Sequence, residues 1–119
     1  MTDVESIFVY GSLRTGMPQH SLLAGARFLG ETLTLAEFTL FDTGEWPAAI
    51  TGGKTAITGE VYAVPKDRLV EIDRYERHPS FFRRTQVMLA DRRSAWMWIY
   101  VAQIQPHWRS LDCGCWQMT

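Results

Sequence analysis

The sequence contains neither a long hydrophobic run nor an excess of one charge. Its longest apolar stretch, residues 95–102, is far shorter than the roughly 20 residues that a membrane-spanning helix needs. The 12 Lys and Arg residues balance the 13 Asp and Glu residues, which leaves a formal net charge of −1. We therefore expect no membrane span, and a protein whose main task is not to bind nucleic acid or anionic lipid.

Cysteine is scarce, and neither a disulfide framework nor a metal centre is indicated. The two cysteines, Cys113 and Cys115, are separated by a single glycine. Such a pair bridges only with strain, and a disulfide-stabilised domain needs more cysteines. The nearest histidine, His107, does not complete a set of metal ligands. We expect reduced thiols in the C-terminal tail and neither a metal nor a cofactor.

The common signatures of catalytic sites are also missing. Ser12 lacks the Gly-x-Ser-x-Gly pattern of a hydrolase nucleophile, and there is no glycine-rich phosphate loop. Asp42 and Asp73 have no partner at the spacing of a catalytic triad. The three histidines are isolated from one another, which is typical of surface or capping residues.

Aromatic residues, by contrast, are plentiful. Five Trp, six Phe and four Tyr make up 13% of the 119 residues, enough large rings to build a hydrophobic core. This length predicts a single domain spanning residues 1–119. The N-terminal residues are acidic and show no signal-peptide pattern, so we expect a cytoplasmic protein.

Short apolar runs punctuated by glycine, proline and aspartate predict mostly strands. We expect strands at 7–10, 28–35, 38–41, 56–64, 82–89 and 95–104. A helix-like stretch covers 19–24, and Pro65 opens a clear helix that ends before Pro79. Residues 42–47 and 111–119 are expected to be loops, and Gly59 marks a bulge or a close backbone approach. Because strands and helices do not alternate regularly, an α+β domain with a largely antiparallel sheet is predicted.

The segment Tyr10-Gly11-Ser12-Leu13 directly follows a predicted buried strand. Glycine lets the backbone turn freely, so successive N–H groups can point at one spot and bind an anion or an oxyanion. The alternative is an ordinary turn at the end of a strand.

Glu76 is the carboxylate whose position points to chemistry. Leu69, Ile72 and Glu76 fall on one face of the predicted helix, which places an acid on its apolar stripe. Burial would raise the pKa of Glu76 toward neutrality and suit it to general acid–base catalysis. The alternative is a structural ion pair with one of four nearby arginines: Arg74, Arg77, Arg83 or Arg84.

Several motifs occur in a fixed order between residues 6 and 116. They are Phe-Val-Tyr-Gly-Ser-Leu-Arg at 8–14, Gly-Glu-Val-Tyr at 59–62, a helix at 69–76 with Asp73, Tyr75 and Glu76, Phe-x-Arg-x-x-Val at 82–87, a Trp-rich strand at 95–100 and Cys-Gly-Cys-Trp at 113–116. In this order they resemble the gamma-glutamylcyclotransferase-like superfamily, which includes the AIG2-like proteins. The resemblance is closest to the bacterial YtfP-type proteins.

The resemblance implies a small mixed, mostly antiparallel β-barrel with flanking helices. It also implies an enzyme that cyclises a γ-glutamyl amine or amino acid to 5-oxoproline and releases the amine. Glu76 would be the general acid/base, and the substrate-binding residues would be Tyr10, Gly11, Ser12, Leu13 and Arg84. The expected partner is this small γ-glutamyl substrate, without nucleic acid, membrane or cofactor, and the expected state is a monomer or a weak homodimer.

Two positions depart from the family's usual pattern. Arg77 follows the acid where the family usually has glycine, and a cation this close would lower the pKa of Glu76. Phe82 replaces the usual tyrosine and lacks its hydroxyl. Both departures favour an alternative, a non-catalytic protein that binds a small carboxylate or amino acid metabolite. A third alternative is a partner-binding face built on Trp96 and Trp98, although two such residues at period two more often belong to a core.

Overall fold

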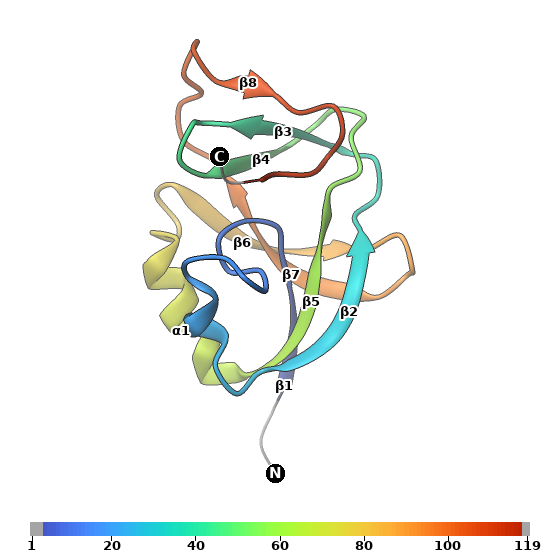
Figure 1. The fold of residues 1–119 in the computed structure, drawn as a ribbon, viewed down its shortest axis with the longest axis vertical. Coiled ribbons are helices and arrows are strands. Elements are labelled where there is room, and N and C mark those ends of the chain that lie inside the picture. Colours follow the sequence, from blue (N-terminus) through green and yellow to red (C-terminus); the bar gives the residue numbers. More distant parts are fainter. Residues whose placement is uncertain (1–3, 118–119) are drawn as a thin grey trace.

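A five-stranded mixed sheet forms the centre of the molecule (Figure 1). The computed structural model describes residues 4–117. The strand order is β2 (Arg27–Leu33), β5 (Thr58–Pro65), β1 (Val4–Val9), β7 (Ser94–Tyr100) and β6 (Phe82–Met88). β1 pairs in parallel with β7, and the other neighbouring strands are antiparallel. The predicted α+β class with a mostly antiparallel sheet is confirmed.

A smaller sheet of three strands lies at one end of the molecule, at the top of Figure 1. Its order is β4 (Pro47–Thr51), β3 (Phe38–Asp42) and β8 (Arg109–Ser110). The helix α1 (Lys66–Tyr75) and a single 3-10 turn, η1 (His20–Leu23), lie together on one side of the large sheet. The site described below lies where α1, the end of β1 and the small sheet approach one another.

The alternation of side chains along β1 divides the core into two clusters. Phe8 and Tyr10 face the cluster that is shared with the small sheet, which includes Leu40 and Met97. The side chains on the opposite face of β1 belong to the cluster beneath α1, whose members are Ile7, Val9, Leu13, Leu23, Tyr62, Val64, Leu69, Ile72 and Trp98. The first strand therefore packs on both faces, and its end is held rigidly.

The helix α1 forms as its sequence predicts. Pro65 precedes the first helical residue, and Asp67 lies in the first turn, where the helix dipole favours an anion. Leu69 and Ile72 are buried against the sheet. The last helical residue is Tyr75, so Glu76 lies at the helix C-terminus, where the chain begins to turn toward β6.

All six predicted strands are present with shifted boundaries, but two short ones were missed. β4 begins at Pro47, inside the segment expected to be a loop, and β8 contains only two residues. Both strands depend on pairing with β3 rather than on a local pattern. The close approach expected at Gly59 is confirmed, because a Cβ atom there would lie 2.5 Å from the carbonyl oxygen of Val9. The bulge lies in β2 instead, between Phe28 and Gly30.

The barrel expected from the resemblance is not confirmed. β2 and β6 are the two edges of the large sheet, and a single isolated bridge, between Thr34 and Leu89, joins their continuations. Among residues 4–117, one α-helix and one 3-10 turn stand where flanking helices were expected. The sheet is therefore best described as strongly curved and open.

The tryptophans of β7, the two cysteines and the termini were also the subject of expectations. Trp98 is buried and Trp96 half-buried, so both belong to the core side of β7 and not to an exposed face. Cys113 and Cys115 are free thiols. Within the described part of the chain, no helix has the length and apolar character to cross a membrane. Residues 1–3, which carry part of the acidic N-terminus, and residues 118–119 of the tail lie outside the described residues.

Candidate functional site

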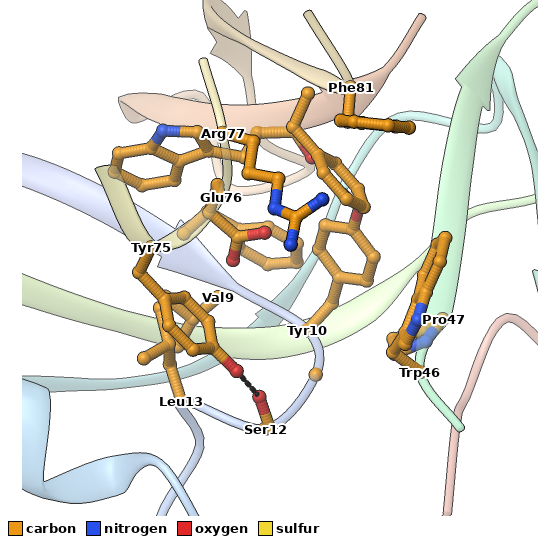
Figure 2. Close-up of a pocket in the computed structure, with 14 residues that line it drawn as sticks. Val9, Tyr10, Ser12, Leu13, Trp46, Pro47, Tyr75, Glu76, Arg77 and Phe81 are labelled. Atoms are coloured by element: carbon orange, nitrogen blue, oxygen red, sulfur yellow. Dashed lines mark hydrogen bonds between the residues drawn. The ribbon is translucent and has the colours of Figure 1, made fainter. Parts of the chain in front are cut away.

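A pocket of about 350 Å³ opens between the end of β1, the β3–β4 loop and the end of α1 (Figure 2). Its volume lies within the range of roughly 300–1,000 Å³ that is usual for small-molecule sites. One wall is the segment 8–13, and the other walls carry Trp46, Pro47, Tyr75, Glu76, Arg77, Phe81, Phe82 and Trp98. The pocket brings together five of the six predicted site residues: Tyr10, Gly11, Ser12, Leu13 and Glu76.

The segment 10–13 turns sharply after β1 and exposes its backbone to the pocket. A Cβ atom at Gly11 would lie 2.9 Å from Cγ of Pro47, so only glycine lets the chain pass this close to the start of β4. Within residues 4–117, the N–H groups of Gly11, Ser12 and Leu13 have no hydrogen-bond acceptor. These are the three donors that the nest expected from the sequence would use.

Two side chains fix this nest in place. The Arg14 Nε donates to the carbonyl oxygen of Gly11 at 3.0 Å, and the same guanidinium donates to the carbonyl of Trp116. On the other side, the hydroxyls of Ser12 and Tyr75 are 2.8 Å apart (Figure 2). The nest is thereby tied both to the C-terminal tail and to the end of α1.

Tyr10 is a buried support of the pocket floor. Its hydroxyl donates to the carbonyl oxygen of Trp98 at 2.7 Å and accepts from the N–H of Ala49 at 3.2 Å. Burial raises the pKa of Tyr10 far above its usual value, and the nearby Glu76 carboxylate raises it further. The hydroxyl therefore stays protonated and links β1, β4 and β7.

The Glu76 side chain points into the pocket from the end of α1 (Figure 2). Within residues 4–117, its carboxylate has neither a hydrogen-bond donor nor a cation at ion-pair distance. Burial raises the pKa of Glu76 from 4.5 to about 7. The expectation that Arg77 would lower this pKa is wrong, because burial is the cause that acts on the carboxyl. A carboxyl with this pKa can both accept and donate a proton near neutrality.

Arg84 lies elsewhere and pairs with a different acid. Its Nε is 3.0 Å from Oδ1 of Asp73, which also accepts a hydrogen bond from Nε1 of Trp98 at 2.8 Å. The guanidinium lies over the ring of Trp96, with Cζ 4.7 Å from the ring centroid. Arg84 is thus absent from the pocket lining, and it is not a partner of Glu76.

Sequence reasoning missed the aromatic wall of the pocket. Trp46 is in the β3–β4 loop and Phe81 precedes β6, and both line the pocket, Trp46 at its side and Phe81 at the end away from Ser12. A Trp-Pro pair within an otherwise polar loop was the available signal. Within the described residues, no group of three or more His, Cys, Asp or Glu side chains could hold a metal ion.

Comparison with known proteins identifies the relatives of this chain. The family model for gamma-glutamyl cyclotransferase, AIG2-like, matches residues 7–118. The chain belongs to the AIG2-like gamma-glutamylcyclotransferase family. It is similar to a putative gamma-glutamylcyclotransferase of Vibrio cholerae, with 34% identity over 92% of this chain and 93% of that protein. A gamma-glutamylaminecyclotransferase of Mus musculus is 34% identical over 70% of this chain and 62% of that protein.

Comparison with solved structures agrees with the fold. The crystal structure of PH0828 from Pyrococcus horikoshii is 31% identical, covers 93% of this chain and 88% of that chain, and has a TM-score of 0.77. The resemblance read from the motifs is thereby confirmed, together with the class of enzyme, a cyclotransferase of the AIG2-like family.

The backbone of this AIG2-like protein favours glycine at position 77, the residue that the resemblance leads us to expect there. Arg77 has φ +56°, a left-handed conformation that glycine adopts freely. A side chain in this conformation costs about 1–2 kcal/mol. Three hydrogen bonds hold it there: the Arg77 N–H donates to Arg74, and the N–H groups of Ser80 and Phe81 donate to the Arg77 carbonyl. Arg77 is thus retained in an unfavourable conformation at the wall of the pocket.

Proposed function

We propose that this protein cyclises a γ-glutamyl amine or amino acid to 5-oxoproline and releases the amine, with Glu76 as the general acid/base. The observation that carries the proposal is the pairing of two features in one pocket: a carboxyl without a protein partner whose pKa is about 7, and a nest of three free backbone donors. The family membership supports the same class of reaction.

The reaction needs a folded-back substrate, one base and an oxyanion site. Glu76 takes a proton from the α-ammonium group, and the free α-amine attacks the γ-carbonyl carbon. A C–N bond forms and closes the five-membered ring, while the carbonyl oxygen becomes an oxyanion. The C–N bond to the leaving nitrogen then breaks. Two protons pass from the α-nitrogen to the leaving nitrogen through Glu76, so the amine departs as an ammonium ion.

Positioning supplies much of the rate in such a reaction. Because nucleophile and electrophile belong to one molecule, holding the ring-closing conformer can contribute several of the roughly 7–11 kcal/mol available from proximity. The N–H groups of Gly11, Ser12 and Leu13 bind the oxyanion or the substrate carboxylate, and one such donor is worth about 2.7–4 kcal/mol in a well-studied hydrolase. Neither a metal nor a covalent nucleophile is needed for these steps.

The whole chain is proposed to act as one domain. Residues that line the pocket come from positions as far apart as Phe8 and Trp98, and the tail reaches the nest through Trp116 and Arg14. All of these residues belong to a single copy of the chain, so a monomer suffices for the reaction. The role of Arg84 proposed here is to position the end of α1 through Asp73 rather than to bind substrate.

Replacing Glu76 with glutamine tests the proposal. Glu76→Gln keeps the shape of the side chain but cannot carry a proton, so 5-oxoproline release from γ-glutamyl dipeptides and γ-glutamyl amines should fall by about 10²–10⁴-fold. The matched control is Glu71→Gln, an exposed acid on the same helix that pairs with Arg68 at 3.5 Å. Undiminished turnover by Glu76→Gln would refute the assignment.

The non-catalytic alternative makes a different structural demand. A binding protein of this kind would have Glu76 paired with Arg77 or Arg84 and closed off from the nest. Instead, the carboxyl shares the pocket with the nest, and Arg84 pairs with Asp73. The same substrate panel separates the two functions, because a binding protein retains γ-glutamyl compounds without releasing 5-oxoproline.

A further inference from the structure

The wall of the pocket opposite the nest has its own chemistry. Ser12, Leu13 and Tyr75 lie at one end of the pocket in Figure 2, and Glu76 lies in the middle. Phe81 lies at the other end, the Arg77 guanidinium lies between Glu76 and Phe81, and Trp46 lies to the side. If the glutamyl group occupies the nest, as the proposed function requires, the leaving group extends past Glu76 toward this far wall.

The guanidinium of Arg77 is available for an anion. Within residues 4–117 no carboxylate lies at ion-pair distance from it. Its Cζ lies 5.4 Å from the centroid of the Phe81 ring, which orients the guanidinium by a cation–π contact without neutralising it. Side chains kept in strained backbone conformations cluster at ligand sites, and Arg77 is one of only two non-glycine residues with positive φ in the described chain.

The aromatic part of the wall is preorganised. The Trp46 N–H donates to Oγ1 of Thr43 at 3.1 Å, and the Thr43 N–H donates to the Trp46 carbonyl at 3.1 Å. The Trp46 ring meets the Phe82 ring edge to face, with centroids 5.6 Å apart. Further rings, Tyr100 and Trp108, support Trp46 from behind. A flat apolar group can therefore enter without much rearrangement of this wall.

We propose that Arg77, Phe81, Trp46 and Phe82 form the subsite for the released amine, and that this subsite selects an amine that carries both a flat apolar group and an anion. The γ-glutamyl derivative of an aromatic amino acid has these features: its ring packs on Trp46 and Phe82, and its carboxylate pairs with Arg77. A leaving group with a second cationic amine is disfavoured, because Arg77 repels it. This inference rests on the proposed function.

Three substrates that differ in charge test the subsite. They are γ-glutamylphenylalanine, γ-glutamylphenethylamide, which lacks only the carboxylate, and γ-glutamylputrescine, which carries a cation. We expect kcat/KM for the phenylalanine compound to exceed that for the phenethylamide by about tenfold or more, the size of one charge-assisted contact, and that for the putrescine compound to be the lowest.

Variants at Arg77 assign the preference to this side chain. The two variants are Arg77→Gly, which suits the left-handed backbone, and Arg77→Gln. In both, the ratio of kcat/KM between the phenylalanine compound and the phenethylamide should fall to about one. Arg74→Gln is the matched control, because it removes a neighbouring exposed cation that does not line the pocket. Its ratio should equal that of the wild type.

The outcomes separate this inference from the proposed function. Turnover of all three substrates at similar rates, or an unchanged ratio in the Arg77 variants, overturns the subsite while leaving the cyclotransferase reaction intact. Absence of 5-oxoproline from every substrate overturns the proposed function. In that case calorimetric binding of the phenylalanine compound and the phenethylamide still tests the subsite, and equal affinities overturn it.

Discussion

At the residue scale, Glu76 gains its properties from burial without a partner. The pKa of its carboxyl is raised from 4.5 to about 7 in the folded protein. A buried carboxyl with a raised pKa lowers the free energy of unfolding at high pH. This loss appears only above the pKa of the unfolded chain, where the unfolded carboxyl has already lost its proton. Between pH 4.5 and about 7 the unfolded state therefore binds fewer protons, and stability declines as the pH rises.

Glu76→Gln should remove this decline. The variant is expected to gain stability relative to the wild type as the pH rises from 4.5 to about 7, and the gain should level off above that pH. Its full size is at most about 3.5 kcal/mol, since one pKa unit corresponds to about 1.4 kcal/mol. Urea unfolding at a series of pH values measures the difference. A difference that stays constant over this range would show that Glu76 is not desolvated.

The sequence predicted Glu76 but could not predict its freedom from an ion pair. Helix periodicity placed it beside Leu69 and Ile72, because this depends only on local geometry. The four candidate arginines lie within eight residues of Glu76, and the sequence alone does not show whether any of them forms an ion pair with it. Only the folded chain shows that Arg84 on β6 faces Asp73 and that Arg77 turns toward Phe81. The strained backbone at Arg77 likewise follows from the hydrogen bonds of the turn, which no pattern of residue types reveals.

At the element scale, Asp73 connects α1 to two strands. It accepts hydrogen bonds from Arg84 on β6 and from Trp98 on β7, and its side chain is only 15% exposed. No sequence pattern indicates this role, since the two donors are 11 and 25 residues away. The helix itself was predictable from Pro65 and its apolar stripe. Its contacts with β6 and β7 could not be predicted, because they depend on how the strands are arranged in the sheet.

Asp73→Ala should therefore destabilise the protein and displace Glu76. Removing the acid leaves Arg84 and the Trp98 N–H without their acceptor, which should cost about 2–4 kcal/mol of unfolding free energy. Glu71→Ala is the control, because it breaks an exposed Arg–Glu pair of the kind worth about 0–1 kcal/mol. Urea unfolding of both variants measures the contrast, and similar small losses would mean that Asp73 does not hold α1 in place.

At the scale of the whole molecule, the C-terminal tail closes the structure next to the site. Trp116 is buried, its carbonyl accepts from Arg14, and its Nε1 donates to Asp42 at 3.2 Å. Through Arg14 the tail supports the nest, and through Asp42 it supports the loop that carries Trp46. The tail was correctly predicted to be a loop over its described residues. Its contribution to the site could not be predicted, because the two Trp116 contacts that support the site span 102 and 74 residues.

Gly114 is the tail position at which we expect a substitution to be least tolerated. Its φ is +72°, and a Cβ atom there would collide with the carbonyl of Ala56. Its own carbonyl accepts from the N–H of Thr58 at 2.8 Å, so the tail cannot move away without losing a contact to the start of β5. Gly114→Ala combines an unfavourable backbone conformation with a backbone clash.

Gly25→Ala shows the first of these effects alone. Gly25 has φ +82°, but a Cβ atom there would meet nothing within 4 Å, so this variant bears only the conformational cost of about 1–2 kcal/mol. Gly114→Ala should lose clearly more unfolding free energy, by about 2 kcal/mol or more beyond the control, as overpacked sites do. It should also lower 5-oxoproline release, because a displaced Trp116 frees Arg14 from the nest. Equal losses in the two alanine variants, with activity retained, would show that the tail covers the fold without supporting the site.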